Sequence, residues 1–189
     1  MAVLLITAAT MGALTIHPGA IGDPIDDAQK RPQLLTFGLH VTPDPEHNPI
    51  DPPERFAGFH SALDYEVFAD EADEEVIVRA ACPGDVVYAG TAEGYGGVIV
   101  HRCVVHDEDV TVLYGHIDPV SFTVDAGDTV DAGQRIAVLA PARTYQSGYN
   151  RKHLHFGVHR GRDVALTGYV QSEAALENFI DPQTLVPRW

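Results

Sequence analysis

The chain has 189 residues, enough for one domain with a hydrophobic core and too few for two full domains. Thirteen prolines and seventeen glycines favour a β-rich fold with many turns over a helical bundle. The formal net charge of −15, from 27 acidic against 12 basic residues, argues against nucleic acid as a partner, because phosphate binding needs clusters of Lys and Arg.

Residues 1–18 form an apolar N-terminal segment, in which Ala2 to Ile16 carry no charge. The segment is shorter than the roughly 20 apolar residues that cross a bilayer, so membrane association beyond an N-terminal signal is not expected. It resembles the apolar region of an export signal, yet no Lys or Arg precedes it and no clear A-x-A cleavage site follows. A truncated signal and an N-terminal strand both fit, and we favour export and an extracytoplasmic location (periplasm, cell envelope or secreted).

Residues 19–55 are predicted to form an irregular arm that wraps over a core or links to it. Prolines block long helices and strands in this segment. They are Pro24, Pro32, Pro43, Pro45, Pro49, Pro52 and Pro53.

A compact domain is expected over residues 56–189. Short apolar runs separated by turn signals predict strands at 76–80, 86–89, 98–103, 110–114, 135–139 and 153–159. Such regular spacing predicts a mainly β fold, an antiparallel β-sandwich or barrel. One short C-terminal helix is predicted, with Ser172 as its N-cap, an apolar face that includes Phe179, and Pro182 as its stop.

The chain has two cysteines, Cys82 and Cys103. They form one disulfide if the chain is exported, or remain as two buried free thiols, and the sequence leaves both alternatives open. Neither lies in a C-x-x-C pair, so a cysteine zinc site is not expected.

Three groups among the ten histidines carry the chemistry. In a strand, His153 and His155 project from one face, separated by roughly twice the 3.3 Å rise, while Leu154 faces the core. His60 and Asp64 would lie roughly 13 Å apart on a straight strand, so the chain must bend or form a helical turn for them to share a metal ion. His116 follows a predicted strand, in a turn that ends at Pro119, where it can line a cleft.

Taken alone, H-x-H also suits a solvent-exposed face, but together these groups supply the nitrogen and carboxylate ligands of an open catalytic zinc site. The order H-x-x-x-D, Y-x-H and H-x-H within an all-β pattern resembles the M23 (LytM, lysostaphin-like) metallopeptidases over residues 59–161. Residues 80–90 are similar to a glycine- and valine-containing strand region of that family, and residues 94–101 to its G-Y-G-N strand. Residues 127–134 resemble its G-D-x-V-x-x-G-Q turn, and residues 153–156 match its H-L-H-F signature.

The resemblance implies a duplicated LytM-type hybrid fold and a Zn²⁺ cofactor held by His60, Asp64 and His155. It implies that His116 and His153 are the catalytic residues, which face the substrate and the metal-bound water. The implied reaction is endopeptidase cleavage of peptidoglycan cross-links, or of another peptide substrate, by a zinc-activated water. Either histidine can take the proton or stabilise the oxyanion, and the sequence leaves that assignment open.

Two other functions remain alternatives. The first is a non-catalytic LytM-type module that binds or activates another hydrolase. The second is a biotinyl-type carrier barrel, since similar G-D-x-V-x-x-G-Q turns occur there. Lys152 does not lie at the hairpin tip that a carrier requires, and a carrier would leave Asp64 without a role.

The chain departs from the family pattern at three places. Ala62 replaces the usual glycine of H-x-G-x-D, which would cost about 1 to 2 kcal/mol if that position needed positive φ. Gly97 replaces the asparagine of G-Y-G-N, a change that we expect to matter less. Residues 147–152 replace the usual Gly-x-Ser/Thr-Gly approach to H-L-H-F, and we expect them to reshape the cleft rim and alter specificity.

Overall fold

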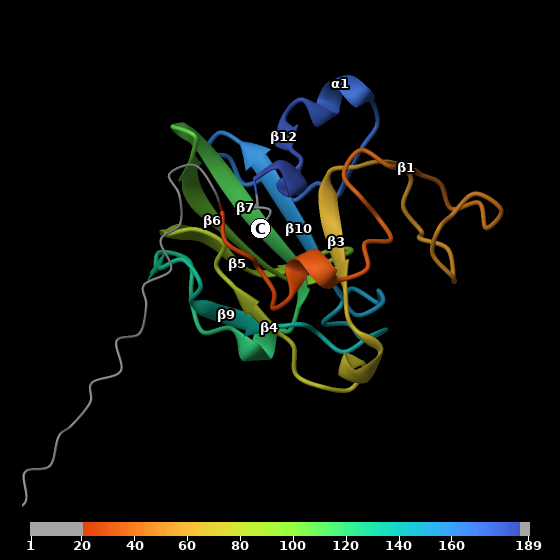
Figure 1. Ribbon diagram of the computed structural model, residues 1–189, viewed down its shortest axis with the longest axis horizontal. Coiled ribbons are helices and arrows are strands. Elements are labelled where there is room, and N and C mark those ends of the chain that lie inside the picture. The colour runs from red at the N-terminus through yellow and green to blue at the C-terminus, as the bar shows by residue number, and fades with distance from the viewer. Residues whose placement is uncertain (1–20, 186–189) are drawn as a thin grey trace, which may run out of the picture.

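The computed structural model describes residues 21–185 and is built mainly from antiparallel β-sheet, as predicted (Figure 1). Its seven-stranded sheet has the order β12-β10-β7-β6-β5-β8, and β3 also pairs with β10. The strands of this sheet are β3 (Ala62–Glu66), β5 (Gly84–Ala92), β6 (Gly96–Val105), β7 (Glu108–Ile117), β8 (Thr129–Val130), β10 (His153–Arg160) and β12 (Phe179–Ile180).

Two smaller sheets flank this large one. The first joins β1 (His40–Val41), β2 (Gly58–His60) and β11 (Tyr169–Val170), and the second pairs β4 (Ile77–Arg79) with β9 (Arg135–Val138). Short 3-10 helices lie at Ala28–Lys30, Ala69–Glu71, Pro119–Ser121 and Pro182–Thr184.

Strands β6 and β7 form a central antiparallel hairpin. Val105 pairs with Glu108, and the two turn residues between them, His106 and Asp107, have φ values of 50° and 64°. Two consecutive left-handed residues are the requirement of a tight hairpin turn whose twist matches that of the strands.

The main core lies against one face of the large sheet. In β10, the buried side chains of Leu154, Phe156 and Val158 alternate with the histidines and all join this core. Ile21 and Ile25 of the arm also belong to it, and the amide of Ile21 donates a hydrogen bond to the carbonyl of Leu185. The two ends of residues 21–185 therefore lie side by side.

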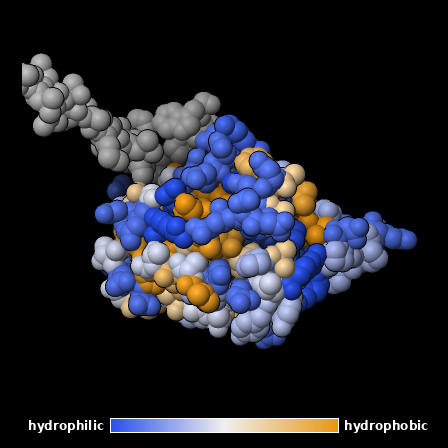
Figure 2. Space-filling view, turned by 90° about the horizontal axis from the view of Figure 1, so that it is seen from below, coloured by the Kyte–Doolittle hydropathy of each residue, from blue (hydrophilic) through white to orange (hydrophobic). Residues whose placement is uncertain are grey.

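The arm also has a small core of its own, in which Leu35, Val41 and Ile50 are buried together. The predicted apolar segment at 1–18 lies outside the described residues. Among residues 21–185, none of the helices has the length and apolar character needed to span a bilayer. Hydrophilic residues cover much of the face shown in Figure 2, with hydrophobic residues visible between them.

The C-terminal helix is shorter than predicted. Helix α1 covers only Glu173–Leu176, and the Ser172 hydroxyl accepts a hydrogen bond from the Ala175 amide, as expected of an N-cap. The prediction that Phe179 continues the helix is wrong, because Phe179 begins β12 and pairs with His159 of β10. Figure 1 shows β12 beside β10 and α1 beyond it. Strand pairing with a distant segment has overridden the local helical pattern.

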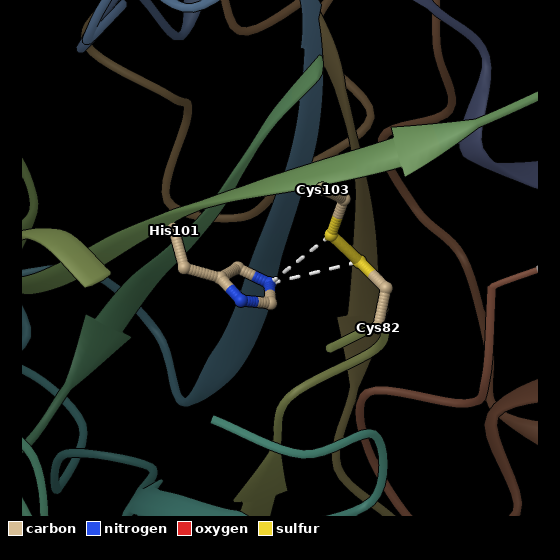
Figure 3. A group of neighbouring side chains, drawn as sticks. All are labelled: Cys82, His101 and Cys103. Carbon is tan, nitrogen blue, oxygen red and sulfur yellow. Dashed lines mark hydrogen bonds between the residues drawn. A yellow bond between two sulfur atoms is a disulfide. The ribbon is translucent and has the colours of Figure 1, made fainter. Parts of the chain in front are cut away.

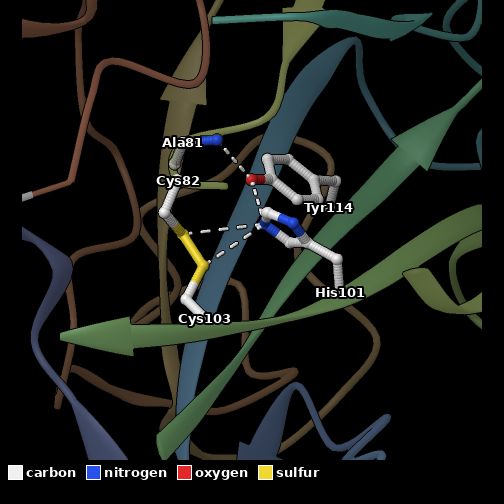
Figure 4. Close-up of a disulfide and its surroundings, with 5 residues drawn as sticks. All are labelled: Ala81, Cys82, His101, Cys103 and Tyr114. Carbon is white, nitrogen blue, oxygen red and sulfur yellow. Dashed lines mark hydrogen bonds between the residues drawn. A yellow bond between two sulfur atoms is a disulfide. The ribbon is translucent and has the colours of Figure 1, made fainter. Parts of the chain in front are cut away.

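Cys82 and Cys103 form a disulfide, which confirms the first of the two alternatives (Figure 4). Both cysteines are buried, and their Cα atoms lie 6.1 Å apart. The Nε2 atom of His101 lies 3.8 Å from the sulfur of Cys82 and 3.7 Å from that of Cys103 (Figure 3). The Ala81 amide donates to the Tyr114 hydroxyl, which lies 3.0 Å from His101 Nε2. The disulfide is thus part of the core.

Candidate metal centre and active site

The site is built on the pairing of β3 with β10. In this register His155 lies opposite Asp64 and His153 lies opposite Glu66, so that these side chains share one face of the sheet. The predicted common face of His153 and His155 is therefore present, and Leu154 points into the core on the other side.

His60 reaches the same point from β2. The strand ends at His60 and β3 begins at Ala62, so the predicted bend between His60 and Asp64 lies at Ser61. The amide of Ser61 donates to the carbonyl of Gly168, and its hydroxyl donates to the carbonyl of Thr167. These two hydrogen bonds anchor the break in the strand.

His60, Asp64 and His155 place three donor atoms at the corners of a nearly equilateral triangle. His60 Nε2 lies 3.2 Å from His155 Nδ1 and 3.3 Å from Asp64 Oδ1, and the third edge, from His155 Nδ1 to Asp64 Oδ1, is 3.1 Å. A tetrahedral zinc ion with bonds of about 2.0 to 2.1 Å separates its ligands by about 3.3 Å. The three predicted ligands therefore match three corners of such a tetrahedron.

The atoms around the triangle leave these three donors free for a metal ion. His60 Nδ1 lies 3.3 Å from the carbonyl of Thr36, and His155 Nε2 lies 3.2 Å from the hydroxyl of Tyr95. Such contacts fix the tautomer and orientation of ligand histidines. Asp64 Oδ1 is buried and accepts no hydrogen bond, although buried polar atoms are normally paired. The residues present therefore fit a tetrahedral zinc ion.

The electrostatics of the site favour the protonation states that bind metal. Burial alone would raise the pKa of Asp64, but the neighbouring His153 and His60 hold that pKa well below its usual value. Burial lowers the pKa of His155 to about 4, against the opposing effect of Asp64. At neutral pH the site therefore presents an ionised carboxylate and a neutral imidazole.

His116 and His153 lie together beside the triangle. The prediction that His116 lies in a turn is wrong, because β7 continues through it to Ile117. His116 has a left-handed φ of 61°. Its Nδ1 atom lies 3.0 Å from the carbonyl of Tyr95 and 2.9 Å from that of Ser147, so Nδ1 carries the proton. Burial, followed by the nearby His153 and His155, lowers the pKa of His116 well below its ordinary value.

A cavity of about 230 Å³ opens over these residues. Asp64, His116, His153 and His155 all line it, whereas His60 is fully buried and is not part of the lining. Its remaining walls include acidic, aromatic and amide side chains. These are Glu54, Phe56, Glu93, Tyr95, Asn150, Tyr169 and Gln171.

Three further residues of the site, Tyr95, Arg151 and Glu66, were not predicted from the sequence. Tyr95 contacts His155, while Arg151 contacts both Asp64 and Glu66. Tyr95 lies within the G-Y-G motif, and Arg151 continues the two-residue period of His153 and His155. The motif and the two-residue period can both be read from the sequence, but neither identifies the residue that Tyr95 or Arg151 contacts.

The condition for strain at Ala62, a positive φ, is not met. Ala62 is a buried residue of β3 without positive φ, because the chain bends at Ser61. It lies opposite Gly157, and a Cβ atom added to that glycine would be 3.6 Å from the Cβ of Ala62. A small residue at position 62 is therefore favoured by packing and not by backbone conformation.

Close packing explains why glycine stands at position 97, and the effect of this departure on function stays a prediction. A Cβ atom on Gly97 would lie 1.9 Å from the carbonyl oxygen of Ile117, so asparagine does not fit here. The segment 147–152 does form part of the cavity rim, because Asn150 lines the cavity and the Ser147 carbonyl contacts His116. Its effect on specificity stays a prediction.

Comparisons with known proteins agree with this architecture. A search of curated proteins found no match. Among solved structures, Csd3 of Helicobacter pylori aligns with a TM-score of 0.51 and 22% identity over 82% of this chain and 36% of its own. Lysostaphin, the antimicrobial peptidase of Staphylococcus simulans, aligns with a TM-score of 0.54 and 19% identity over 90% of this chain and 54% of its own. A chain of the SpoIIQ–SpoIIIAH pore-forming complex aligns with a TM-score of 0.58 and 15% identity over 90% of this chain and 92% of its own.

These structural alignments establish a common fold. The chain spans about a third of the Csd3 chain and about half of the lysostaphin chain. The model of a family described as Peptidase family M23 matches residues 58–166, which is more than half of the sequence and contains all the predicted site residues. The chain therefore belongs to peptidase family M23.

Proposed function

We propose that the protein is a zinc metalloendopeptidase that hydrolyses peptide cross-links of peptidoglycan. The observation that carries this proposal is the triangle of donor atoms from His60, Asp64 and His155, whose edges of 3.1 to 3.3 Å fit a tetrahedral zinc ion. When bound, zinc supplies a Lewis acid and a water molecule whose pKa is close to neutral.

His116 is suited to accept the proton of the attacking water. Its Nδ1–H is directed at two backbone carbonyls, which leaves the lone pair on Nε2, and its lowered pKa keeps the ring neutral at neutral pH. His153 lines the cavity beside it, with Nδ1 at 3.0 Å from the carbonyl of Arg151 and Nε2 at 3.2 Å from Asp64 Oδ2. We assign His153 to the stabilisation of the oxyanion.

Peptidoglycan as the substrate and an extracytoplasmic location are supported by separate observations. Lysostaphin, which shares the fold, is an antimicrobial peptidase. The buried disulfide between Cys82 and Cys103 is typical of proteins in oxidising compartments. Peptides are therefore the proposed partner, and nucleic acid remains unexpected for so acidic a chain.

The alternative is a non-catalytic module that binds or activates another protein. The similarity to a chain of the SpoIIQ–SpoIIIAH complex favours it. The convergence of all five predicted residues, His60, Asp64, His116, His153 and His155, on one site favours the enzyme.

Zinc content and cleavage of purified peptidoglycan, measured together, test the proposal. His155→Ala should lose both the metal and the activity, whereas His116→Ala should keep the metal and lose the activity. A wild-type protein without stoichiometric zinc, or an active His155→Ala variant, would overturn the assignment. Full zinc occupancy without cleavage would support the non-catalytic module.

A further inference from the structure

We infer that Arg151 is a positioning residue of the metal centre, which occupies one oxygen of Asp64 and leaves the other as the only oxygen available to the metal. The inference rests on the proposed zinc site. It concerns how this chain presents its carboxylate ligand, at a position where the resemblance to the family predicted a different loop.

The two oxygens of Asp64 have different surroundings. Oδ2 lies 2.7 Å from Nη2 of Arg151 and 3.2 Å from Nε2 of His153. Oδ1 is buried, accepts no hydrogen bond, and faces His60 and His155 at 3.3 and 3.1 Å. One oxygen is thus bound by a cation, while the other is directed into the triangle of donors.

Glu66 holds the guanidinium of Arg151 in place. Nε of Arg151 lies 2.9 Å from Oε2 of Glu66, and Nη2 lies 2.7 Å from Oε1, which is a bidentate arrangement. Glu54 adds a longer contact, with its Oε2 atom 3.7 Å from Nη1. The Arg151 side chain is only 14% exposed. Held in this way, the planar guanidinium directs Nη2 at Oδ2 of Asp64.

The arrangement follows from the strand register. Asp64 and Glu66 are two residues apart on β3, and Arg151, His153 and His155 follow the same period on the partner segment. The guanidinium therefore bridges two consecutive carboxylates of one strand face. Lysine offers a single ammonium group on a flexible stem and does not reproduce this bidentate bridge.

The consequence is a carboxylate that binds the metal through one oxygen. A carboxylate that bound through both oxygens would fill a second coordination position, which an open catalytic site needs for water and the substrate carbonyl. Residues that hold a metal ligand by hydrogen bonds typically change metal affinity by about 10- to 100-fold when they are replaced. We expect an effect of that size for Arg151.

Zinc affinity tests this inference without reference to activity. The protein is stripped with a chelator, and zinc binding is measured by competition with a chromophoric chelator for wild type, Arg151→Lys and Arg160→Lys. Arg160 is a matched control, since it lies at the far end of β10, the strand that follows Arg151, and pairs with Glu108 at the exposed surface. Arg151→Lys should weaken zinc binding by about tenfold or more, and Arg160→Lys by less than about twofold.

Cobalt provides a second readout of the ligand geometry. The visible absorption of Co²⁺ is intense in four-coordinate sites and weaker in five-coordinate ones. Arg151→Lys should therefore weaken the absorption, because Asp64 becomes free to bind through both oxygens. Should Arg151→Lys fail to fold by circular dichroism, Glu66→Gln removes the support of the guanidinium without changing residue 151 and should lower zinc affinity in the same direction.

The possible outcomes separate the two proposals. Equal zinc affinities and equal cobalt spectra for wild type and the folded Arg151 or Glu66 variant would overturn the role of Arg151 and leave the zinc site intact. A wild-type protein that binds no zinc would overturn the proposed function and this inference with it.

Discussion

The imidazole rings of His116 and His153 lie 4.4 Å apart, centroid to centroid, with an angle of 41° between their planes. They come from strands β7 and β10, and each ring directs Nδ1 toward a backbone carbonyl. Because the rings are in contact, we expect a change in one ring to alter the position and electrostatics of the other.

We therefore predict that substitutions of His116 and His153 are not additive. His116→Ala and His153→Ala should each lower kcat by about 10² to 10⁴, the usual contribution of a positioned acid or base. The kcat of the double variant should be little lower than that of the less active single variant, as expected for groups that work together. The measurement is kcat on purified peptidoglycan, with zinc content determined in parallel. Fully multiplicative losses would show that the two histidines act independently.

Gly97 gives a second prediction, about stability. Because an added Cβ atom would lie 1.9 Å from the Ile117 carbonyl oxygen, Gly97→Ala should lower the free energy of unfolding by about 3 kcal/mol or more. Gly157→Ala is the control, since its Cβ atom would meet only ordinary contacts beyond 3.5 Å. Urea denaturation of both variants measures the difference. A Gly97→Ala protein as stable as Gly157→Ala would contradict the close approach.

These two sites show which features the sequence predicts and which it does not. The common face of His153 and His155 follows from strand periodicity, which is a local property. The close contact of Gly97 with Ile117, and the bridge from Arg151 to Asp64, depend on partners from other strands. Strand pairing sets such distances, and the spacing of residues within one strand does not by itself identify the partner strand.

The convergence of His60 and Asp64 illustrates the same limit. Their spacing required a bend, and the family pattern pointed to position 62, whereas the bend is at Ser61, anchored by the carbonyls of Thr167 and Gly168. Likewise, Phe179 suits a helix locally but pairs with His159 of β10. In both cases a hydrogen-bond partner distant in sequence decided the local conformation.

The disulfide gives a third prediction. The two cysteines are 21 residues apart, so cross-linking them restricts the unfolded chain and should stabilise the fold by about 3 kcal/mol. The double variant with Cys82→Ala and Cys103→Ala should unfold at correspondingly lower urea concentration. Adding a phosphine reductant should destabilise the wild type and leave the double variant unchanged. If the double variant is as stable as the wild type, and the reductant does not change the stability of the wild type, the cross-link contributes nothing to stability.

His101 gives a fourth prediction, about the pH dependence of stability. Burial lowers the pKa of His101 to about 4, whereas its ordinary value is 6.5. Between these two pH values the unfolded chain binds a proton that the folded protein does not, so the free energy of unfolding falls as pH falls. A difference of this size corresponds to about 3 kcal/mol, present above pH 6.5 and lost as the pH approaches 4.

His101→Gln isolates this contribution. Glutamine does not titrate, and its side-chain amide can form a hydrogen bond with the Tyr114 hydroxyl, which lies 3.0 Å from His101 Nε2. Urea unfolding of both proteins at pH 7 and pH 4 measures the effect, and any loss of metal or protonation of other groups is common to the two proteins. The wild type should lose about 3 kcal/mol more than His101→Gln on acidification. If both lose the same amount, His101 is either charged in the folded protein at pH 4 or already neutral in the unfolded chain, because only a group with different pKa values in the two states links pH to stability.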